Sequence, residues 1–366
     1  MSCPSCHEPV RPGDAFCEAC GTDLTGVSAA AAAPDETPST DHTGDAASGG
    51  PKTSQITRAA DPMGTGAAER ACLACGGDVD ADGFCTVCGQ KAPTARDHWT
   101  ESPAAWVGAV CDKGIVHARN EDAMAIASTA DRTRAVLVVC DGVTSAPDSD
   151  KASIAAARAA CRTLTEAPPA SGDSFPARLT HWEQQLVIAC RDANAEAVGV
   201  AHRLGDPPEP PSCTFVAAVI EDDLLSAAWC GDSRAYWLPD AGAGHQLGVD
   251  HSIGAALIAA GTPPEDAERD PGFHTITRWL GADSIDPTPE CVSQRLDTPG
   301  WVLVCSDGMW NYASEAAPLA ALIETARRDG AADPTAIAEA MAAWANDQGG
   351  HDNITVALAR IDARVP

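Results

Sequence analysis

The chain has 366 residues, and its 52 acidic against 24 basic side chains give a formal net charge of −28. This length exceeds what one ordinary hydrophobic core needs, so two or more domains are expected. The acid surplus, without any local run of Lys or Arg, disfavours broad binding to nucleic acid or anionic membranes, and the apolar content of 45% excludes a wholly disordered chain.

The amino-terminal residues, MSCPSCHEPV, lack a basic segment followed by an apolar one, so no secretory signal is expected. No stretch of about 18 apolar residues predicts a membrane-spanning helix. The chain is therefore expected to be cytoplasmic, where thiols stay reduced and structural disulfides are unusual.

Eight of the sixteen cysteines form four CxxC pairs, in two short segments that each supply four thiols. So short a segment buries too little surface to fold without a metal, and structural zinc takes four thiolate ligands in a tetrahedron. The pattern predicts two structural Zn2+ ions in two zinc ribbons, over residues 1–24 and 70–92. The expected ligands are Cys3, Cys6, Cys17 and Cys20 in the first, and Cys72, Cys75, Cys85 and Cys88 in the second. Which pair shares which zinc stays open, although loop closure favours neighbouring pairs.

Glycine follows three of the four pairs, as Gly21, Gly76 and Gly89, and lets the backbone turn back toward the sulfurs. Many zinc ribbons bind nucleic acid, but Arg11 is the one basic residue of the first segment, and Arg70 and Lys91 are the two of the second. A protein-docking module is therefore the preferred interpretation, and nucleic-acid recognition is a third reading that lacks a basic face.

Residues 25–69 consist largely of small and polar residues and are expected to be a disordered linker. A connector over 93–103 leads to a domain over 104–366. The eight single cysteines of that domain are expected to be small buried hydrophobes. They are Cys111, Cys140, Cys161, Cys190, Cys213, Cys230, Cys291 and Cys305.

Strand and helix patterns alternate through this domain. Strands are predicted over 106–112, 135–140, 214–220, 224–230, 234–238, 290–296, 301–305 and 354–361. Helices are predicted over 148–166, 176–204, 315–328 and 334–347. Two helices fall after the second strand, two more precede the last strand, and 214–238 reads as an antiparallel meander. This grouping indicates an α+β domain with helices covering stacked sheets.

Acidic residues recur where predicted strands begin or end in tight turns. They lie in Asn120-Glu121-Asp122, Cys140-Asp141-Gly142, Gly231-Asp232-Ser233, Ser306-Asp307-Gly308 and His351-Asp352-Asn353. Asp-Gly turns explain any one of these without a function. Several converging carboxylates would repel one another unless cations lay between them, and hard oxygen ligands select Mg2+ or Mn2+.

In this order and spacing, the motifs resemble the metal-dependent protein phosphatase (PPM) family, the 2C-type Ser/Thr phosphatases. The matching segments are GIVHARNED (114–122), VVCDGV (138–143), GDSRAYW (231–237), ITRWLG (276–281), LVCSDGMW (303–310) and GGHDNITVAL (349–358). The resemblance covers residues 104–362 and implies a four-layer α-β-β-α sandwich with its site between the two central sheets.

The resemblance also implies the roles of the acids. Asp141 would bridge two Mg2+ or Mn2+ ions, with the Gly142 carbonyl on one of them, and Asp307 and Asp352 would complete the other. Glu121 and Asp122 match the acidic pair that holds metal-bound waters, and Asp232 matches the position of a third, more labile metal in bacterial members. Two cations about 3.5–4 Å apart would activate a water for in-line attack, with no covalent intermediate.

Two positions depart from the family pattern. His117 stands where the family usually carries an arginine that clamps the phosphate, and the nearest arginine is Arg119. A histidine lacks the guanidinium fork, so phosphate affinity is expected to fall or to depend on pH. Val143 stands where eukaryotic relatives carry a histidine, so a metal-bound water would protonate the leaving group. His351 is a second candidate for that role, although an incidental loop position explains it better.

The sequence therefore predicts a Mg2+/Mn2+-dependent protein Ser/Thr phosphatase of phosphoproteins. A Ser/Thr kinase and its targets are the expected partners, and the ribbons are expected to dock a further protein. The alternative is a weakly active or inactive phosphatase-like protein that binds phosphoproteins, and His117 is the residue that supports it.

Overall fold

A computed structural model describes residues 56–58, 75–80, 83–89, 92, 94–170 and 174–362. Cys3, Cys6, Cys17, Cys20 and Cys72 lie outside these residues, as do the first predicted ribbon and most of the predicted linker. None of the helices within the described ranges is long and apolar enough to cross a bilayer.

Most strands belong to two six-stranded antiparallel sheets, ordered β1-β4-β5-β7-β8-β12 and β10-β9-β13-β14-β3-β2, and β6 pairs with β11. The strands are β1 (Ile56–Arg58), β2 (His98–Ala104), β3 (Val107–Asp112), β4 (Ala123–Thr129), β5 (Arg134–Cys140), β6 (Ser212–Cys213), β7 (Phe215–Glu221), β8 (Leu224–Cys230), β9 (Arg234–Pro239), β10 (His245–Gln246), β11 (Leu280–Gly281), β12 (Glu290–Arg295), β13 (Gly300–Cys305) and β14 (Ile354–Ile361).

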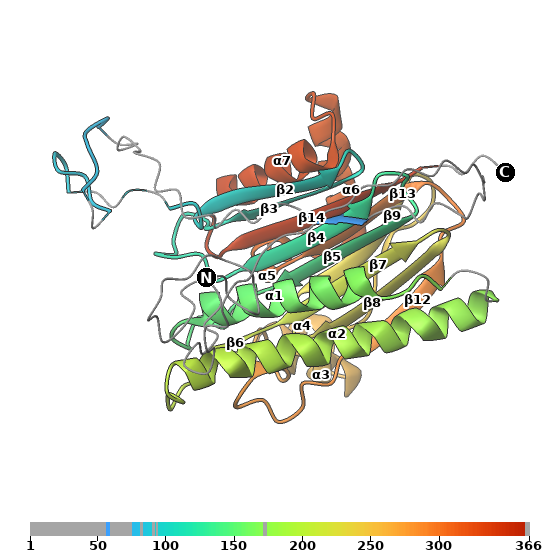
Figure 1. Ribbon diagram of the computed structural model, residues 1–366, viewed down its shortest axis with the longest axis horizontal. Helices are drawn as coiled ribbons and strands as arrows, with labels where there is room; N and C mark the ends of the chain where they lie inside the picture. Colours follow the sequence, from blue (N-terminus) through green and yellow to red (C-terminus); the bar gives the residue numbers. More distant parts are fainter. Residues whose placement is uncertain are drawn as a thin grey trace, which may run out of the picture. The chain divides into compact units, whose positions relative to one another are not determined.

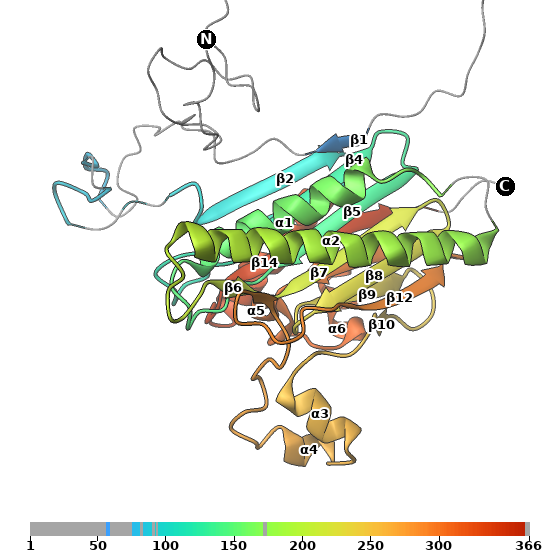
Figure 2. The same cartoon turned by 60° about the horizontal axis from the view of Figure 1, so that its bottom comes forward.

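Helices cover the outer face of each sheet (Figure 1). They are α1 (Ser149–Glu166), α2 (Phe175–Arg203), α3 (Ile253–Ala259), α4 (Pro264–Ala267), α5 (Asp307–Trp310), α6 (Ala316–Arg328) and α7 (Pro334–Asp347). The long helices α1 and α2 lie on one side of the sheets, and α6 and α7 lie on the other. The short helices α3 and α4 extend away from the sheets (Figure 2).

Three apolar cores separate the four layers. The first lies between α1, α2 and the sheet of β4, β5, β7 and β8, around the fully buried Trp182. The second lies between the two sheets, and the third packs α5, α6 and α7 on the other sheet. Because both faces of the central strands are covered, β5, β7 and β8 are buried at every position. The predicted four-layer α-β-β-α sandwich is confirmed.

Every helix and strand predicted from the sequence is present, within one residue at each end. Seven of the eight single cysteines are buried and Cys291 is half-buried, as expected for small core residues. Strand β4 was not predicted, because its alanine-rich sequence AMAIAST has low strand propensity, and several short elements were not predicted either.

Two predicted boundaries are wrong. The connector predicted over 93–103 contains most of β2, which pairs with β3 through His98↔Asp112, so the folded domain begins before residue 104. Within the predicted linker, Ile56–Arg58 pairs with Ala127–Thr129 of β4. The physical reason is the same in both places: each sheet had an edge strand whose backbone groups could accept a further strand.

Strand register sets the position of the acids. In one sheet Ala123 pairs with Cys140, so Asp122 and Asp141 flank the same end of neighbouring strands. In the other sheet Cys305 pairs with Val356, so the turn carrying Asp307 meets the turn carrying Asp352. Both pairs of turns lie at one end of the sandwich.

Candidate active site

The predicted acids from the two sheets converge at this end and affect one another electrostatically. Burial raises the pKa of Asp141 well above its usual range, and the charges of Asp122, Asp307, Asp352 and Asp232 raise it further. Burial, followed by the repulsion of Asp307, likewise raises the pKa of Asp232. The structure therefore brings together the five aspartates that the sequence analysis singled out.

Asp122 is the most deeply placed of these acids, with no exposed surface. Its Oδ2 accepts hydrogen bonds from Ser306 Oγ at 2.6 Å and Thr355 Oγ1 at 2.7 Å, whereas its Oδ1 is buried without a partner. Burial raises the pKa of Asp122 to about 8, although the two hydrogen bonds lower it, and the charges of Asp352 and Asp307 raise it further. Asp122 thus presents one desolvated, unpaired oxygen.

Asp307 shows the same pattern. Asn311 Nδ2 donates to its Oδ2 at 3.1 Å, and its Oδ1 is buried without a partner. Burial, followed by the charge of Asp352, raises its pKa to about 6. Two unpaired buried carboxylate oxygens in one acidic cluster are a fit for hard divalent cations, which supply the missing positive charge.

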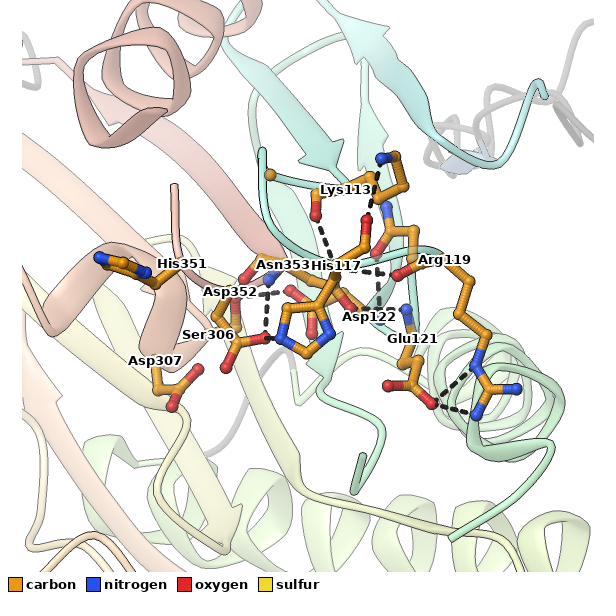
Figure 3. A network of polar contacts seen from close by, with 12 residues as sticks. Lys113, His117, Arg119, Glu121, Asp122, Ser306, Asp307, His351, Asp352 and Asn353 are labelled. Atoms are coloured by element: carbon orange, nitrogen blue, oxygen red, sulfur yellow. Dashed lines mark hydrogen bonds and ion pairs between the residues drawn. The ribbon is translucent and has the colours of Figure 1, made fainter. Parts of the chain in front are cut away.

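Glu121 and His117 lie on the loop that precedes β4 (Figure 3). Glu121 is buried, and its Oε1 accepts from Arg119 Nε at 2.9 Å, Arg119 Nη2 at 2.6 Å and Ser149 Oγ at 2.6 Å. His117 Nε2 lies 3.3 Å from Asp352 Oδ1, so His117 faces the acids while Arg119 is bound to Glu121. Arg119 is therefore engaged by Glu121, whereas His117 lies beside Asp352.

His351 is exposed, and its ring points away from Asp307 and Asp352 (Figure 3). Its backbone N–H donates to Tyr312 Oη at 3.0 Å. This placement supports the interpretation of His351 as a loop residue and gives it no proton-transfer partner among the acids.

Asn353 joins the two sheets at the site, a role that the sequence analysis missed. Its Oδ1 accepts from Glu121 N at 2.7 Å, and its Nδ2 donates to the carbonyls of Lys113 and Arg119 at 2.7 and 3.1 Å. Its own N–H donates to Asp352 Oδ1 at 2.7 Å. The signal was present, since Asn353 directly follows a predicted ligand, but only the fold reveals partners more than 200 residues away.

Two glycines let the turns approach closely. A Cβ on Gly142 would lie 2.6 Å from the Glu121 carbonyl oxygen, and one on Gly308 would lie 2.0 Å from the Asn353 carbonyl oxygen. Backbone therefore packs against backbone where the acids meet, with no flexible side chain to move aside.

Gly308→Ala should lower the free energy of unfolding by about 1–3 kcal/mol, because the methyl group forces the turns of Asp307 and Asn353 apart. Gly199→Ala is the matched control, since its Cβ would meet only the end of the Arg203 side chain at 3.3 Å and alanine favours a helix. Urea unfolding measures both. Equal effects of the two variants would contradict the close approach at Gly308.

The raised pKa values predict a pH dependence of stability when divalent cations are removed. Asp122 has a pKa of about 8 in the fold against 3.8 as its ordinary value, so between these values the folded chain holds a proton that the unfolded chain has released. The free energy of unfolding should therefore fall as pH rises from about 5 to about 8. Asp122→Asn should flatten this slope in thermal unfolding, and an unchanged slope would contradict the assignment.

Of the four cysteines of the second predicted ribbon, the structure describes Cys75, Cys85 and Cys88. The sulfur atoms of Cys75, Cys85 and Cys88 lie within 4.8 Å of one another. Backbone N–H groups of Cys88 and Val87 lower the pKa of Cys85 to about 6, which favours the thiolate that zinc binds. Gly76 and Gly89 have φ of 71° and 72°, which confirms the predicted turns after these pairs.

Comparisons with known proteins agree with this arrangement. A family model described as protein phosphatase 2C matches residues 115–346, and one described as double zinc ribbon matches residues 3–89. The chain is 28% identical to a serine/threonine phosphatase stp from Listeria innocua over 249 residues, which cover 68% of this chain and 92% of that protein.

Solved structures share the fold. The serine/threonine phosphatase Stp1 from Staphylococcus aureus aligns with a TM-score of 0.54 and 25% identity, over 70% of this chain and 95% of its own. The catalytic domain of the serine/threonine protein phosphatase PstP in complex with two manganese ions aligns with a TM-score of 0.53 and 23% identity, over 70% of this chain and 98% of its own.

Proposed function

The chain belongs to the protein phosphatase 2C family, and on this premise we propose that it hydrolyses phosphoserine and phosphothreonine in protein substrates with two Mg2+ or Mn2+ ions. The observation that carries the proposal is the pair of buried, unpaired carboxylate oxygens, Asp122 Oδ1 and Asp307 Oδ1, inside a cluster of acids that raise one another's pKa. Such a cluster is costly unless cations neutralise it.

The metal ligands follow from this cluster and the family pattern. Asp141 would bridge the two ions, the Gly142 carbonyl would bind one, and Asp307 and Asp352 would bind the other. Glu121 and Asp122 would hold coordinated waters, and Asp232 would bind a third ion. When bound, the ions would lower the pKa of a water and neutralise the phosphoryl oxygens.

The chain's own residues would orient the substrate and the acids. His117 Nε2 lies 3.3 Å from Asp352 Oδ1, and its N–H would exchange this carboxylate for a phosphoryl oxygen that arrives beside it. Lys113 Nζ donates to the His117 carbonyl at 3.0 Å and so holds this loop. Asn353 fixes Glu121 and Asp352 through the hydrogen bonds described above.

The role of His117 separates the proposal from its alternative, a weakly active phosphoprotein-binding protein. His117→Arg should lower KM for a phosphothreonine peptide about tenfold and leave kcat within about threefold, because a guanidinium fork adds a charge-assisted hydrogen bond. His351→Arg is the matched control, since His351 points away from the acids, and should change neither constant. A gain of several orders of magnitude in kcat/KM for His117→Arg would instead favour the alternative.

For the amino-terminal module we propose two structural Zn2+ ions and a protein-docking role. The support is the double zinc ribbon match and the convergence of Cys75, Cys85 and Cys88. Elemental analysis of the full chain should find two zinc ions, and Cys85→Ser should lower this to one. Cys291→Ser, at a half-buried single cysteine, should leave two. Two zinc ions retained by Cys85→Ser would contradict the assignment.

A further inference from the structure

Arg96, which belongs to none of the motifs discussed above, hydrogen-bonds the backbone of the turn that carries Glu121 and Asp122. In the sequence, Arg96 lies between the cysteines of the second predicted ribbon and β2. Its Nε donates to the Asn120 carbonyl at 3.2 Å, and its Nη2 donates to the Asp122 carbonyl at 2.7 Å. The Arg96 carbonyl in turn accepts from Asn120 Nδ2 at 3.1 Å.

Arg96 also ties this turn to α1. Its Nη2 donates to the Asp150 carbonyl at 3.1 Å and approaches Ser153 Oγ at 3.4 Å. Ser153 Oγ donates to the Glu121 carbonyl at 2.5 Å. Arg96 and Ser153 together therefore fix the three successive carbonyls of Asn120, Glu121 and Asp122.

The guanidinium of Arg96 is itself held in one place. It lies over the ring of Trp99, with Cζ 5.0 Å from the ring centroid, and its Nη1 is buried without a hydrogen-bond partner. Trp99 is 6% exposed and belongs to the core between the two sheets. A rigid fork on a rigid platform can fix backbone carbonyls to a precision that a flexible ammonium group cannot.

We propose that Arg96 is a positioning residue that sets the divalent-cation affinity of the site through the Asn120–Asp122 turn. This inference rests on the proposed function, because it requires Glu121 and Asp122 to act at a metal centre. It also makes the segment that follows the cysteine module a functional part of the catalytic domain.

Charge and geometry make opposite predictions here. Arg96 adds positive charge near the acids, so if its charge alone mattered, its removal would strengthen cation binding. If Arg96 positions the turn, its removal should weaken cation binding. Lysine at position 96 keeps the charge but lacks the guanidinium fork, so it should not restore cation binding.

The test is Mn2+ binding to the full chain, measured by electron paramagnetic resonance of free Mn2+ at a temperature where each variant is folded. Arg96→Met should raise the Mn2+ dissociation constant about tenfold, and Arg96→Lys about fivefold or more. At saturating Mn2+, KM for a phosphothreonine peptide should stay within about twofold. A general loss of stability would not produce this selective change.

Arg360→Met is the matched control. Like Arg96, Arg360 lies over a tryptophan, with Cζ 5.2 Å from the centroid of the Trp301 ring, and donates to a backbone carbonyl, that of Gly300. It lies at the end of β14 away from the acids. The Mn2+ affinity of Arg360→Met should therefore equal that of the wild type. Unchanged or tighter Mn2+ binding by Arg96→Met, or full affinity in Arg96→Lys, would overturn the inference. Absence of Mn2+ binding by the wild type would instead overturn the proposed function.

Discussion

Asp141→Asn should lower kcat/KM for a phosphothreonine peptide about a thousandfold or more. The side chain lies at the centre of the acidic cluster, where the charges of Asp122, Asp307, Asp352 and Asp232 all act on it. Replacing its carboxylate removes the ligand proposed to bridge both cations, and losing one such electrostatic element costs at least two to three orders of magnitude.

The fold should survive this change. The backbone of Asp141 is held by Thr214, whose Oγ1 accepts from Asp141 N at 3.0 Å and whose N–H donates to the Asp141 carbonyl at 2.7 Å. Without divalent cations the melting temperature of Asp141→Asn should equal or exceed that of the wild type, because one repelling carboxylate is gone. Asp297→Asn, at an exposed position far from the cluster, is the control and should keep full activity. Normal turnover by Asp141→Asn would contradict the proposed site.

Glu221→Ala should lower the free energy of unfolding by about 3–5 kcal/mol. Glu221 is 5% exposed, and its Oε2 accepts from Arg134 Nε at 3.1 Å and Nη2 at 2.7 Å. Its Oε1 accepts from Trp182 Nε1 and Ala170 N, both at 3.0 Å. Removing it leaves a buried guanidinium and two buried N–H groups without their acceptor.

Glu221→Ala should lower stability without lowering activity. Glu221 ends β7, whereas the residue next to the start of β7, Thr214, supports Asp141 at the other end of the strand. Below its melting temperature the variant should keep kcat/KM within about threefold. Glu324→Ala breaks the exposed pair with Arg327, whose side chains are 55% and 45% exposed, and should cost less than about 1 kcal/mol. Urea unfolding measures both variants. Similar losses in the free energy of unfolding for Glu221→Ala and Glu324→Ala would contradict the claim that the buried ion pair contributes more to stability than the exposed one.

The acids could be predicted because their signal is local. Asp141 and Asp307 follow apolar strands within two residues, and Asp352 precedes one, so the strand ends singled out these acids and the family resemblance assigned them to one site. The layered architecture followed from helix and strand periods, together with the family resemblance.

The supporting residues could not be predicted because their partners are distant in sequence. Arg96 reaches Asn120 across 24 residues and Ser153 across 57, and Asn353 reaches Glu121 across 232. The β4 strand was missed because its alanines carry little strand propensity, although burial on both faces and the partner strand β5 compensate for that weakness.

The directions of the two histidine side chains could be determined only from the fold. His117 and His351 both stand near acids in the sequence, and only the side-chain directions separate them. His117 contacts Asp352, whereas His351 turns away from it (Figure 3). His117 therefore remains the residue proposed to stand where the family carries its arginine, while Arg119 binds Glu121.

The central claim is that the acidic cluster works through divalent cations, and phosphate release from a phosphothreonine peptide tests it most directly. The full chain would be freed of Mg2+ and Mn2+ by gel filtration and assayed as Mn2+ is added back. Phosphate release should be negligible without Mn2+ and should rise saturably as Mn2+ is added, and Asp141→Asn should show no such rise. Release that does not depend on added Mn2+ or Mg2+, or no release at saturating Mn2+, would contradict it.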